Sequence, residues 1–436
     1  MMQRTQQIET HDLFMELTHL TTLRKAFYAV KRNRGAAGID GVTVEDYEAR
    51  LDEELTTLKE ELTSWRYKPN PVRRVEIPKP SGGVRLLGVP CVRDRVVQTG
   101  LKLLMEPILD PTFSAHSYGF RPGRNQRGAV KQAQTLVTSG KPFIVDLDLS
   151  KFFDRINHDR LIARLGKRIT DNRVLRLVGM TLRSGVLVDG VFEMNEEGVT
   201  QGSPLSPLLS NLVLDELDKE LERRGLPFCR FADDCNIFAG SRKAADRIML
   251  KISEFIETKL KLVVNREKSR VGLSHEVKFL GMTIVNGTIA ISRKALSHAM
   301  NKVKELTPRG THTRLETTMS KINNWYIGWA NYYSMTQYPS QLRKIEAHIR
   351  RRLRSRLVSQ QKSRRNLYNK VVKRGVKKRT AWLAVYSNRK RWALSHTRAM
   401  EMAYRNRWFT DTVGQMLYSD RGLSHWFSVD TWIRLT

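Results

Sequence analysis

The sequence predicts an α+β domain followed by an all-helical region. Over the first two-thirds of the chain, short runs of β-branched and aromatic residues alternate with longer stretches of helical periodicity. The composition changes near residues 285–310, where Pro308, Arg309 and Gly310 interrupt the pattern. Beyond residue 300, 29 Lys and Arg stand against only 7 Asp and Glu. A chain of 436 residues is long enough for two or three domains.

The individual elements follow from hydrophobic periodicity. Strands are expected at 72–77, 143–147, 228–238 and 262–264. Helices are expected at 48–62, 95–109, 205–224 and 241–260. Ile322, Trp325, Tyr326, Trp329 and Tyr333 share one face of a further helix, and this spacing favours a place in a core over base stacking.

The charge of the chain indicates a polyanionic partner. The formal net charge is +32 and the isoelectric point is near 10.3. Because 40% of the residues are apolar, this charge belongs to a folded body and not to a disordered tail. Nucleic acid is the first candidate partner and an anionic membrane is the alternative. Size and composition exclude a peptide hormone or a single small binding module.

The cysteines and the N-terminus indicate a cytoplasmic protein. Cys91, Cys229 and Cys235 lack the spacing of a disulfide framework or a zinc site. No run of eighteen apolar residues could cross a bilayer, and the first residues include no secretory signal. Early acidic residues such as Glu9 and Asp12 argue against an organellar transit peptide.

One segment carries most of the basic excess. Between Arg343 and Arg379 there are sixteen cations and one acid, Glu346, with apolar residues at partly helical spacing. The pattern is typical of cationic helices with one packed face. Such a run repels itself unless phosphates neutralise it, which favours contact with nucleic acid over a merely solvated surface.

Two acidic motifs could carry chemistry. FCRFADDCNIF (228–238) places Asp233 and Asp234 between apolar strand-like flanks, although a polar turn between two strands is the commoner meaning of such a pair. FIVDLDLSKFFD (143–154) ends an apolar run in Asp146, Asp148 and Asp154. Carboxylates gathered from separate strands suit Mg²⁺, and two such ions can stabilise both oxygens of a phosphoryl displacement.

Two glycine-containing segments accompany these acids. IPKPSGGVR (77–85) places Lys79 and Arg85 on either side of a Gly-Gly turn, where they could grip a polyphosphate or form an ordinary surface hairpin. In VTQGSPLSPLLSN (199–211), Gly202 permits close backbone approach, and the alternative is a simple loop before a helix.

Taken in order, these motifs resemble a reverse transcriptase encoded by a bacterial group II intron, a protein also called a maturase. The resemblance covers nearly the whole chain. Its motifs are NRGAAGIDGVTVEDY (33–47), PVRRVEIPKPSGGVRLLGVPCVRDRVVQ (71–98), SYGFRPGRNQ (117–126), VDLDLSKFFDRINHD (145–159), QGSPLSPLLSN (201–211), RFADDCNIF (230–238), NREKS (265–269), KFLGM (278–282) and INNWYIGWANYY (322–333).

The resemblance implies a right-hand polymerase and assigns roles to its acids. Fingers and a palm with an antiparallel sheet would occupy residues 1–295. Asp148, Asp233 and Asp234 would be the ligands of two Mg²⁺ ions, for which Mn²⁺ can substitute. Asp146 would lie behind them.

The resemblance also assigns the nucleotide contacts. Lys79 and Arg85 match the pair that binds the triphosphate, and Gln201 matches the glutamine beside the incoming nucleotide. Phe153 matches the bulky residue that rejects a 2′-hydroxyl. Lys268 resembles the lysine proposed to protonate the leaving pyrophosphate.

Past the palm, the resemblance implies two further domains. Residues 296–380 would form a helical thumb, the maturase domain, which binds RNA, and residues 381–436 would form a small basic DNA-binding domain. Many relatives end in a nuclease domain, but after residue 380 this chain has only His396 and His425 and no Cys, so we expect a compact type without nuclease. Two positions depart from the family pattern: Thr200 replaces a usual Pro, and Phe231 stands where Tyr is commoner.

The expected function is RNA-directed DNA polymerisation with binding of intron RNA to assist splicing and retrohoming. The partners would be an RNA template and intron RNA, a DNA primer and target, and dNTPs, with no membrane. The alternatives are a domesticated relative in DNA repair or phage defence and a non-catalytic RNA-binding splicing factor. A basic structural RNA-binding protein would explain the charge but not the ordered acidic motifs.

Overall fold

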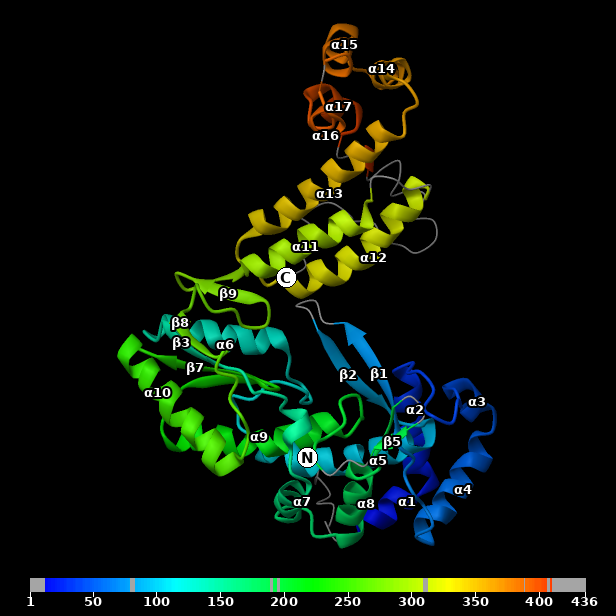
Figure 1. Cartoon of the computed structure of the whole chain (residues 1–436), viewed down its shortest axis with the longest axis vertical. Coiled ribbons are helices and arrows are strands. Elements are labelled where there is room, and N and C mark those ends of the chain that lie inside the picture. The colour runs from blue at the N-terminus through cyan, green and yellow to red at the C-terminus, as the bar shows by residue number, and fades with distance from the viewer. Residues whose placement is uncertain are drawn as a thin grey trace, which may run out of the picture. The chain divides into compact units, whose positions relative to one another are not determined.

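The chain folds as two units that divide after Leu273 in the computed structural model (Figure 1). The structure describes residues 12–78, 83–188, 191–193, 197–308, 313–387, 389–405 and 408–409. This division follows the packing of the backbone. The boundaries of the functional domains, expected at residues 295 and 380, remain a proposal.

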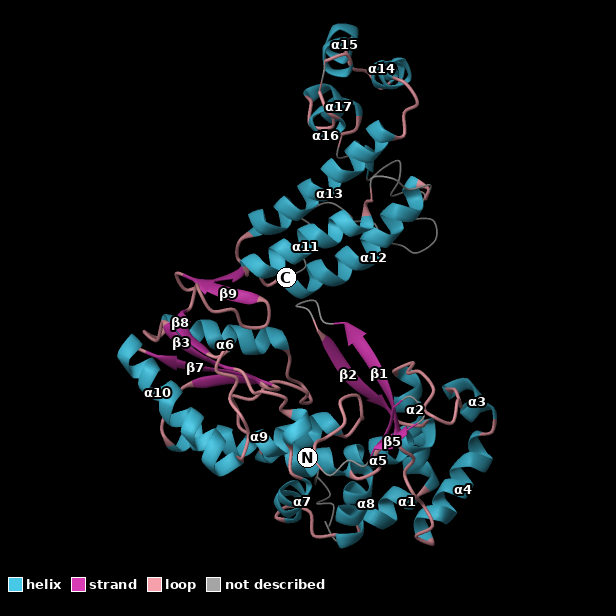
Figure 2. Ribbon diagram, viewed as in Figure 1, coloured by secondary structure: helices cyan, strands magenta, loops and turns pink. Residues whose placement is uncertain are grey.

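An antiparallel sheet in the first unit has the strand order β6-β7-β3-β8 (Figure 2). Its strands are β3 (Phe143–Leu147), β6 (Phe228–Phe231), β7 (Asp234–Ala239) and β8 (Arg270–Leu273). The expected strand at 143–147 is confirmed, and the run at 228–238 folds as the hairpin β6-β7. Helices α6 (Gln126–Thr138) and α10 (Arg242–Phe255) pack against these strands.

The strand expected at 262–264 is wrong. Lys261 adopts a left-handed conformation with φ of 58°, which ends the helical path through Ile256–Leu260 and turns the chain. Val264 forms only an isolated bridge to Leu149. The strand that pairs with this side of β3 is β8, which begins six residues later at Arg270.

A second sheet in this unit has the order β2-β1-β4-β5. Its strands are β1 (Val72–Pro78), β2 (Val84–Val89), β4 (Val186–Val188) and β5 (Val191–Glu193). β1 and β2 form the expected antiparallel hairpin, in which Pro78 pairs with Val84. The Gly-Gly turn itself lies outside the described residues.

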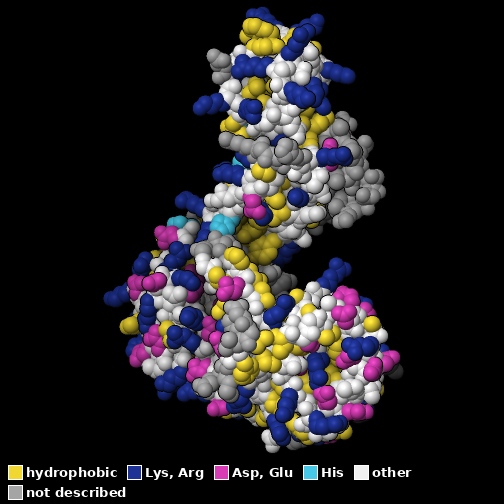
Figure 3. All heavy atoms as spheres, turned by 45° about the vertical axis from the view of Figure 1, so that its right-hand side comes forward, with side chains coloured by type: hydrophobic (Ala, Val, Ile, Leu, Met, Phe, Trp, Pro, Cys, Tyr) yellow, Lys and Arg dark blue, Asp and Glu magenta, His cyan; other side chains and the backbone are white. Residues whose placement is uncertain are grey.

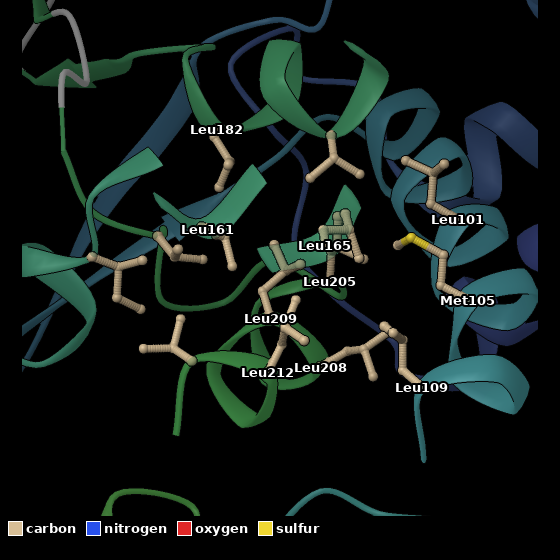
Figure 4. Packing of buried hydrophobic residues seen from close by; sticks show 14 of the residues in the cluster. Leu101, Met105, Leu109, Leu161, Leu165, Leu182, Leu205, Leu208, Leu209 and Leu212 are labelled. Carbon is tan, nitrogen blue, oxygen red and sulfur yellow. The ribbon is translucent and has the colours of Figure 1, made fainter. Parts of the chain in front are cut away.

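Helices build the core beneath these sheets. They are α1 (Leu13–Thr18), α2 (Leu20–Arg32), α3 (Val44–Ala49), α4 (Leu51–Thr63), α5 (Val92–Leu109), α7 (His158–Gly166), α8 (Asn172–Leu182) and α9 (Ser206–Arg223). Leucines of α5, α7 and α9 meet side by side in this core (Figure 4). The helix expected at 48–62 is split, because Arg50 leaves the helical conformation between α3 and α4.

The second unit is mostly helical, as expected. A hairpin of β9 (Met282–Val285) and β10 (Thr288–Ile291) precedes the helices. The helices are α11 (Arg293–Leu306), α12 (Leu315–Tyr333), α13 (Pro339–Ser359), α14 (Arg364–Lys373), α15 (Lys378–Val385), α16 (Arg391–Leu394) and α17 (Arg398–Ala403). Ile322 and Tyr326 of α12 are buried, and Trp325 and Trp329 pack against the same core, which confirms the core assignment of this stripe.

A fully buried ion pair ties the hairpin β6-β7 to helix α9. Arg230 Nε and Nη2 donate to the two carboxylate oxygens of Asp218 at 2.7 and 2.5 Å, and both side chains have no exposed surface. Arg230 Nη1 also donates to Asn211 Oδ1 at 3.0 Å and to the carbonyl of Ala232 at 2.8 Å. Asn211 in turn donates to the carbonyl of Gly119. One guanidinium therefore fixes the tip of the hairpin to the helix behind it.

We expect Arg230→Met to lower the free energy of unfolding of the first unit by about 3–5 kcal/mol, because Asp218 is left charged and buried. Denaturant unfolding measures this change. The double variant Arg230→Met/Asp218→Leu should recover most of it. Arg242→Met, which removes an exposed ion pair with Asp246, is the matched control and should have little effect. Equal losses in Arg230→Met and Arg242→Met would contradict the role assigned to the buried pair.

Candidate active site

The strands β3 and β7 bring the predicted acids to one end of their sheet. Leu147 pairs with Cys235, and the next residue along each strand at that end is Asp148 and Asp234. Asp233 lies in the two-residue turn between Phe231 and Asp234. Ala232, the other turn residue, has a φ of 57°, a conformation that a small side chain tolerates better than a bulky one. The strand register therefore places these three acids at one end of the sheet.

The acids interact electrostatically. Although Asp233 reaches the surface, surrounding protein raises the pKa of its carboxyl, and the negative charge of Asp148 raises it further. The positive charge of Arg85 acts in the opposite direction. Within the part of the chain that the structure describes, no three His, Cys, Asp or Glu side chains are close enough to form a ready metal site. Asp148 and Asp233 thus behave as a neighbouring pair with a cation beside them.

A polar turn after Val264 holds Asp148 in place. The Asp148 carbonyl accepts a hydrogen bond of 2.8 Å from the Asn265 amide, and the Asp148 amide donates to Ser269 Oγ at 3.0 Å. Lys268 lies in the same turn, with its Nζ 4.0 Å from Asp148 Oδ1. The sequence analysis assigned Lys268 here but missed Asn265 and Ser269. Their place within the motif NREKS was the available signal.

The hairpin β1-β2 supplies Arg85. Its side chain is exposed on β2, where Arg85 pairs with Ile77. Its effect on the ionisation of Asp233 indicates that it lies on the acidic side of the unit. Lys79, the second predicted cation, lies outside the described residues. Of these two cations, Arg85 is near enough to Asp233 for its charge to lower the pKa of that carboxyl.

The backbones of Gln201 and Phe153 are both held by hydrogen bonds to other segments of the first unit. The Gln201 carbonyl accepts from the Gly88 amide of β2 at 2.8 Å. Gly202 has a φ of 111°, and a Cβ there would lie 2.7 Å from the Gly88 carbonyl oxygen, so the predicted close approach requires glycine. Phe153 is partly buried against Phe152, with ring centroids 5.1 Å apart, and its carbonyl accepts from the Val199 amide at 2.7 Å.

A buried contact next to Gln201 escaped the sequence analysis. Ser203 Oγ donates to Gln98 Oε1 at 2.9 Å, and both side chains are buried. The bond joins the loop after Gln201 to helix α5. Gln98 closes the motif that carries Lys79 and Arg85, and its place in that motif was the available signal.

Comparison with known families matches two stretches of the chain. Residues 77–284, which contain every predicted site residue, match the family described as reverse transcriptase (RNA-dependent DNA polymerase). Residues 296–376 match the maturase-specific domain of group II introns.

Individual proteins are similar over the same region. Protein YkfC of Escherichia coli is 34% identical over 54% of this chain and 71% of its own length. The putative COX1/OXI3 intron 1 protein of Saccharomyces cerevisiae is 30% identical over 63% of this chain and 32% of its own. The group II intron-encoded protein LtrA of Lactococcus lactis is 29% identical over 58% of this chain and 41% of its own. The chain thus spans less than half of the two intron proteins. With both domain matches in order along one chain, it belongs to the group II intron reverse transcriptases, RNA-directed DNA polymerases that also carry a maturase domain.

Proposed function

We propose that this chain extends a DNA primer on an RNA template with dNTPs, and that it binds intron RNA to assist splicing and retrohoming. The observation that supports the polymerase site most directly is the strand register that puts Asp148, Asp233 and Asp234 at one end of the sheet, with Lys268 Nζ 4.0 Å from Asp148 Oδ1. A site that handles nucleoside triphosphates needs both a carboxylate group for metal ions and cations for phosphate.

Asp148, Asp233 and Asp234 are the proposed ligands of two Mg²⁺ ions, and Mn²⁺ can substitute. The donor set fits: all three side chains offer hard carboxylate oxygens, and each retains exposed surface at the end of the sheet. When bound, the ions supply positive charge to the phosphoryl group and to the attacking and leaving oxygens.

The remaining side chains bind and orient the substrate. Arg85, by a bidentate fork, and Lys79, as a point charge, hold the triphosphate. Gln201 lies beside the nucleotide, and Phe153 lies under the sugar and excludes a 2′-hydroxyl. Lys268, which is exposed and 4.0 Å from Asp148, donates a proton to the departing pyrophosphate.

The second unit supplies the RNA-binding surface. Four arginines of α13 bind other residues of the second unit and so stabilise its fold. Arg350 pairs with Glu346, and Arg352 donates a hydrogen bond to Thr307. Arg354 donates to the Tyr404 carbonyl, and Arg356 donates to Thr318. Exposed cations on α13, α14 and the following turn remain for phosphates. We assign residues 296–380 to the RNA-binding thumb and 381–436 to binding of the DNA target.

The setting we propose is the cytoplasm. None of the described helices is long and apolar enough to cross a membrane. The maturase match favours an intron RNA partner over a domesticated repair or defence role, and no observation favours a non-catalytic splicing factor.

The polymerase assignment is tested by Asp233→Ala/Asp234→Ala. We expect primer extension on an RNA template with Mg²⁺ to fall at least about 1,000-fold, because metal-derived charge stabilisation contributes several kcal/mol. RNA binding should be retained. Asp52→Ala/Glu53→Ala, an adjacent exposed acidic pair on α4, is the matched control. Extension that survives in the first variant would refute the site.

The sugar selection is tested by Phe153→Ala. We expect incorporation of ribonucleotides relative to deoxynucleotides to rise about tenfold or more, since the bulk that meets the 2′-hydroxyl is gone. Competition assays with rNTPs and dNTPs measure the ratio. Phe153→Tyr keeps the bulk and should keep the discrimination. An unchanged ratio in Phe153→Ala would mean that another residue excludes the hydroxyl.

The RNA-binding surface is tested by replacing Lys344, Arg351 and Lys370, all exposed, with Gln. If each contacts a phosphate, the slope of log K against log salt should flatten by about 0.7–0.9 per residue. Lys59→Gln on α4 is the control and should leave the slope unchanged. A triple variant that behaves like this control would identify the segment as a solvated helical surface.

A further inference from the structure

The outer face of α15 presents large apolar side chains to solvent. Arg379, Trp382, Leu383 and Tyr386 follow one another at positions i, i+3, i+4 and i+7. Trp382 is 55% exposed, Leu383 57% and Tyr386 40%. The helix packs through its opposite face, where Ala381, Ala384 and Val385 are buried. The fold of the second unit therefore does not require the exposed side chains.

Aromatic rings make this face nearly continuous. The ring centroids of Trp382 and Tyr386 are 5.8 Å apart, and Tyr368 of α14 lies 6.1 Å from Tyr386. We use the name α15 patch for Trp382, Leu383 and Tyr386. Helices α14 and α15 lie at one end of the second unit. Hydrophobic side chains are surrounded there by Lys and Arg (Figure 3).

The sequence on both sides of the patch is strongly basic. Between Glu346 and Glu401 the sequence has no acidic residue and eighteen Lys and Arg. Lys377, Lys378 and Arg379, all exposed, directly precede the patch. A second copy of this chain would bring like charges together, so the charge argues against self-association here. The occupant must combine negative charge with flat apolar faces.

Unpaired nucleotides have both properties. A single strand offers phosphates to the cations and free base faces to the rings, whereas the bases of a duplex are stacked on one another. We propose that the α15 patch is a stacking platform for single-stranded nucleic acid. The inference rests on the proposed nucleic-acid function and deepens it, because it names the side chains of the C-terminal region that would stack on bases.

Binding of short oligouridylate and oligothymidylate to the full chain, followed by fluorescence anisotropy, tests the platform. We expect Trp382→Ala to weaken binding of the single strands about tenfold, in the range that one lost stacking contact gives. Trp382→Phe should restore most of the affinity. Tyr28→Ala, which removes an exposed aromatic ring from α2, is the matched control and should change nothing.

Salt dependence separates stacking from charge. Trp382→Ala should leave the slope of log K against log salt unchanged, while Arg379→Gln should flatten it by about 0.7. Affinity for a duplex of the same length should not change in Trp382→Ala. A loss for duplex as large as for single strands, or no loss for either, would overturn the proposal. Vesicles of anionic lipid that bind with the same dependence on Trp382, without such dependence for the oligonucleotides, would identify a membrane surface and also overturn it.

Photocrosslinking locates the strand directly. Oligonucleotides carrying 5-iodouracil should crosslink to the peptide that contains Trp382 or Tyr386, and crosslinks confined to the first unit would refute the site. The DNA and RNA versions distinguish the two sources of single strand. Primer extension by the unaltered chain is measured in parallel, so an inactive polymerase and an absent platform give different results.

Discussion

The ion pair between Arg230 and Asp218 is the contact on which the candidate active site depends. Adjacent carboxylates at the tip of a hairpin repel each other, and a two-residue turn has few contacts of its own to resist that repulsion. Here the guanidinium behind the turn holds the Ala232 carbonyl and anchors to α9 through both oxygens of Asp218. Burial raises the pKa of the Asp218 carboxyl, and the bidentate contact opposes that rise. The acidic tip is therefore positioned by a charge pair that never meets solvent.

Local patterns predicted most of the secondary structure because each element carries its own signal. The apolar run of β3 and the long apolar faces of α5 and α9 needed no tertiary information. The strand at 262–264 failed because its short apolar run follows a left-handed residue, and a backbone conformation at Lys261 has no signature in composition. The break at Arg50 escaped for the same reason, since helical periodicity continues across it.

Of the candidate site, the sequence predicted the acidic residues but not the polar residues that hold them in place. Asp148, Asp233 and Asp234 stand out as acids in apolar surroundings, and their order along the chain carried the family resemblance. Asn265, Ser269, Gln98 and Ser203 did not stand out, because single polar residues occur everywhere and their partners lie about 100 or more residues away. The charge of α13 was also harder to interpret from the sequence. The pattern suggested that its cations form one surface for nucleic acid, but Arg354 and Arg356 are buried within the second unit.

The hydrogen bond between Gly88 and Gln201 ties strand β2 to the loop at Gln201. Arg85 and Gly88 lie on the same short strand, and the Gly88 amide donates to the Gln201 carbonyl. If Arg85 holds the triphosphate and Gln201 lies beside the incoming nucleotide, as proposed above, a shift of this strand that moved one contact would also move the other. Recognition of the nucleotide and retention of its phosphates would then be mechanically coupled, so an ill-fitting nucleotide would loosen its own phosphates and shorten its stay.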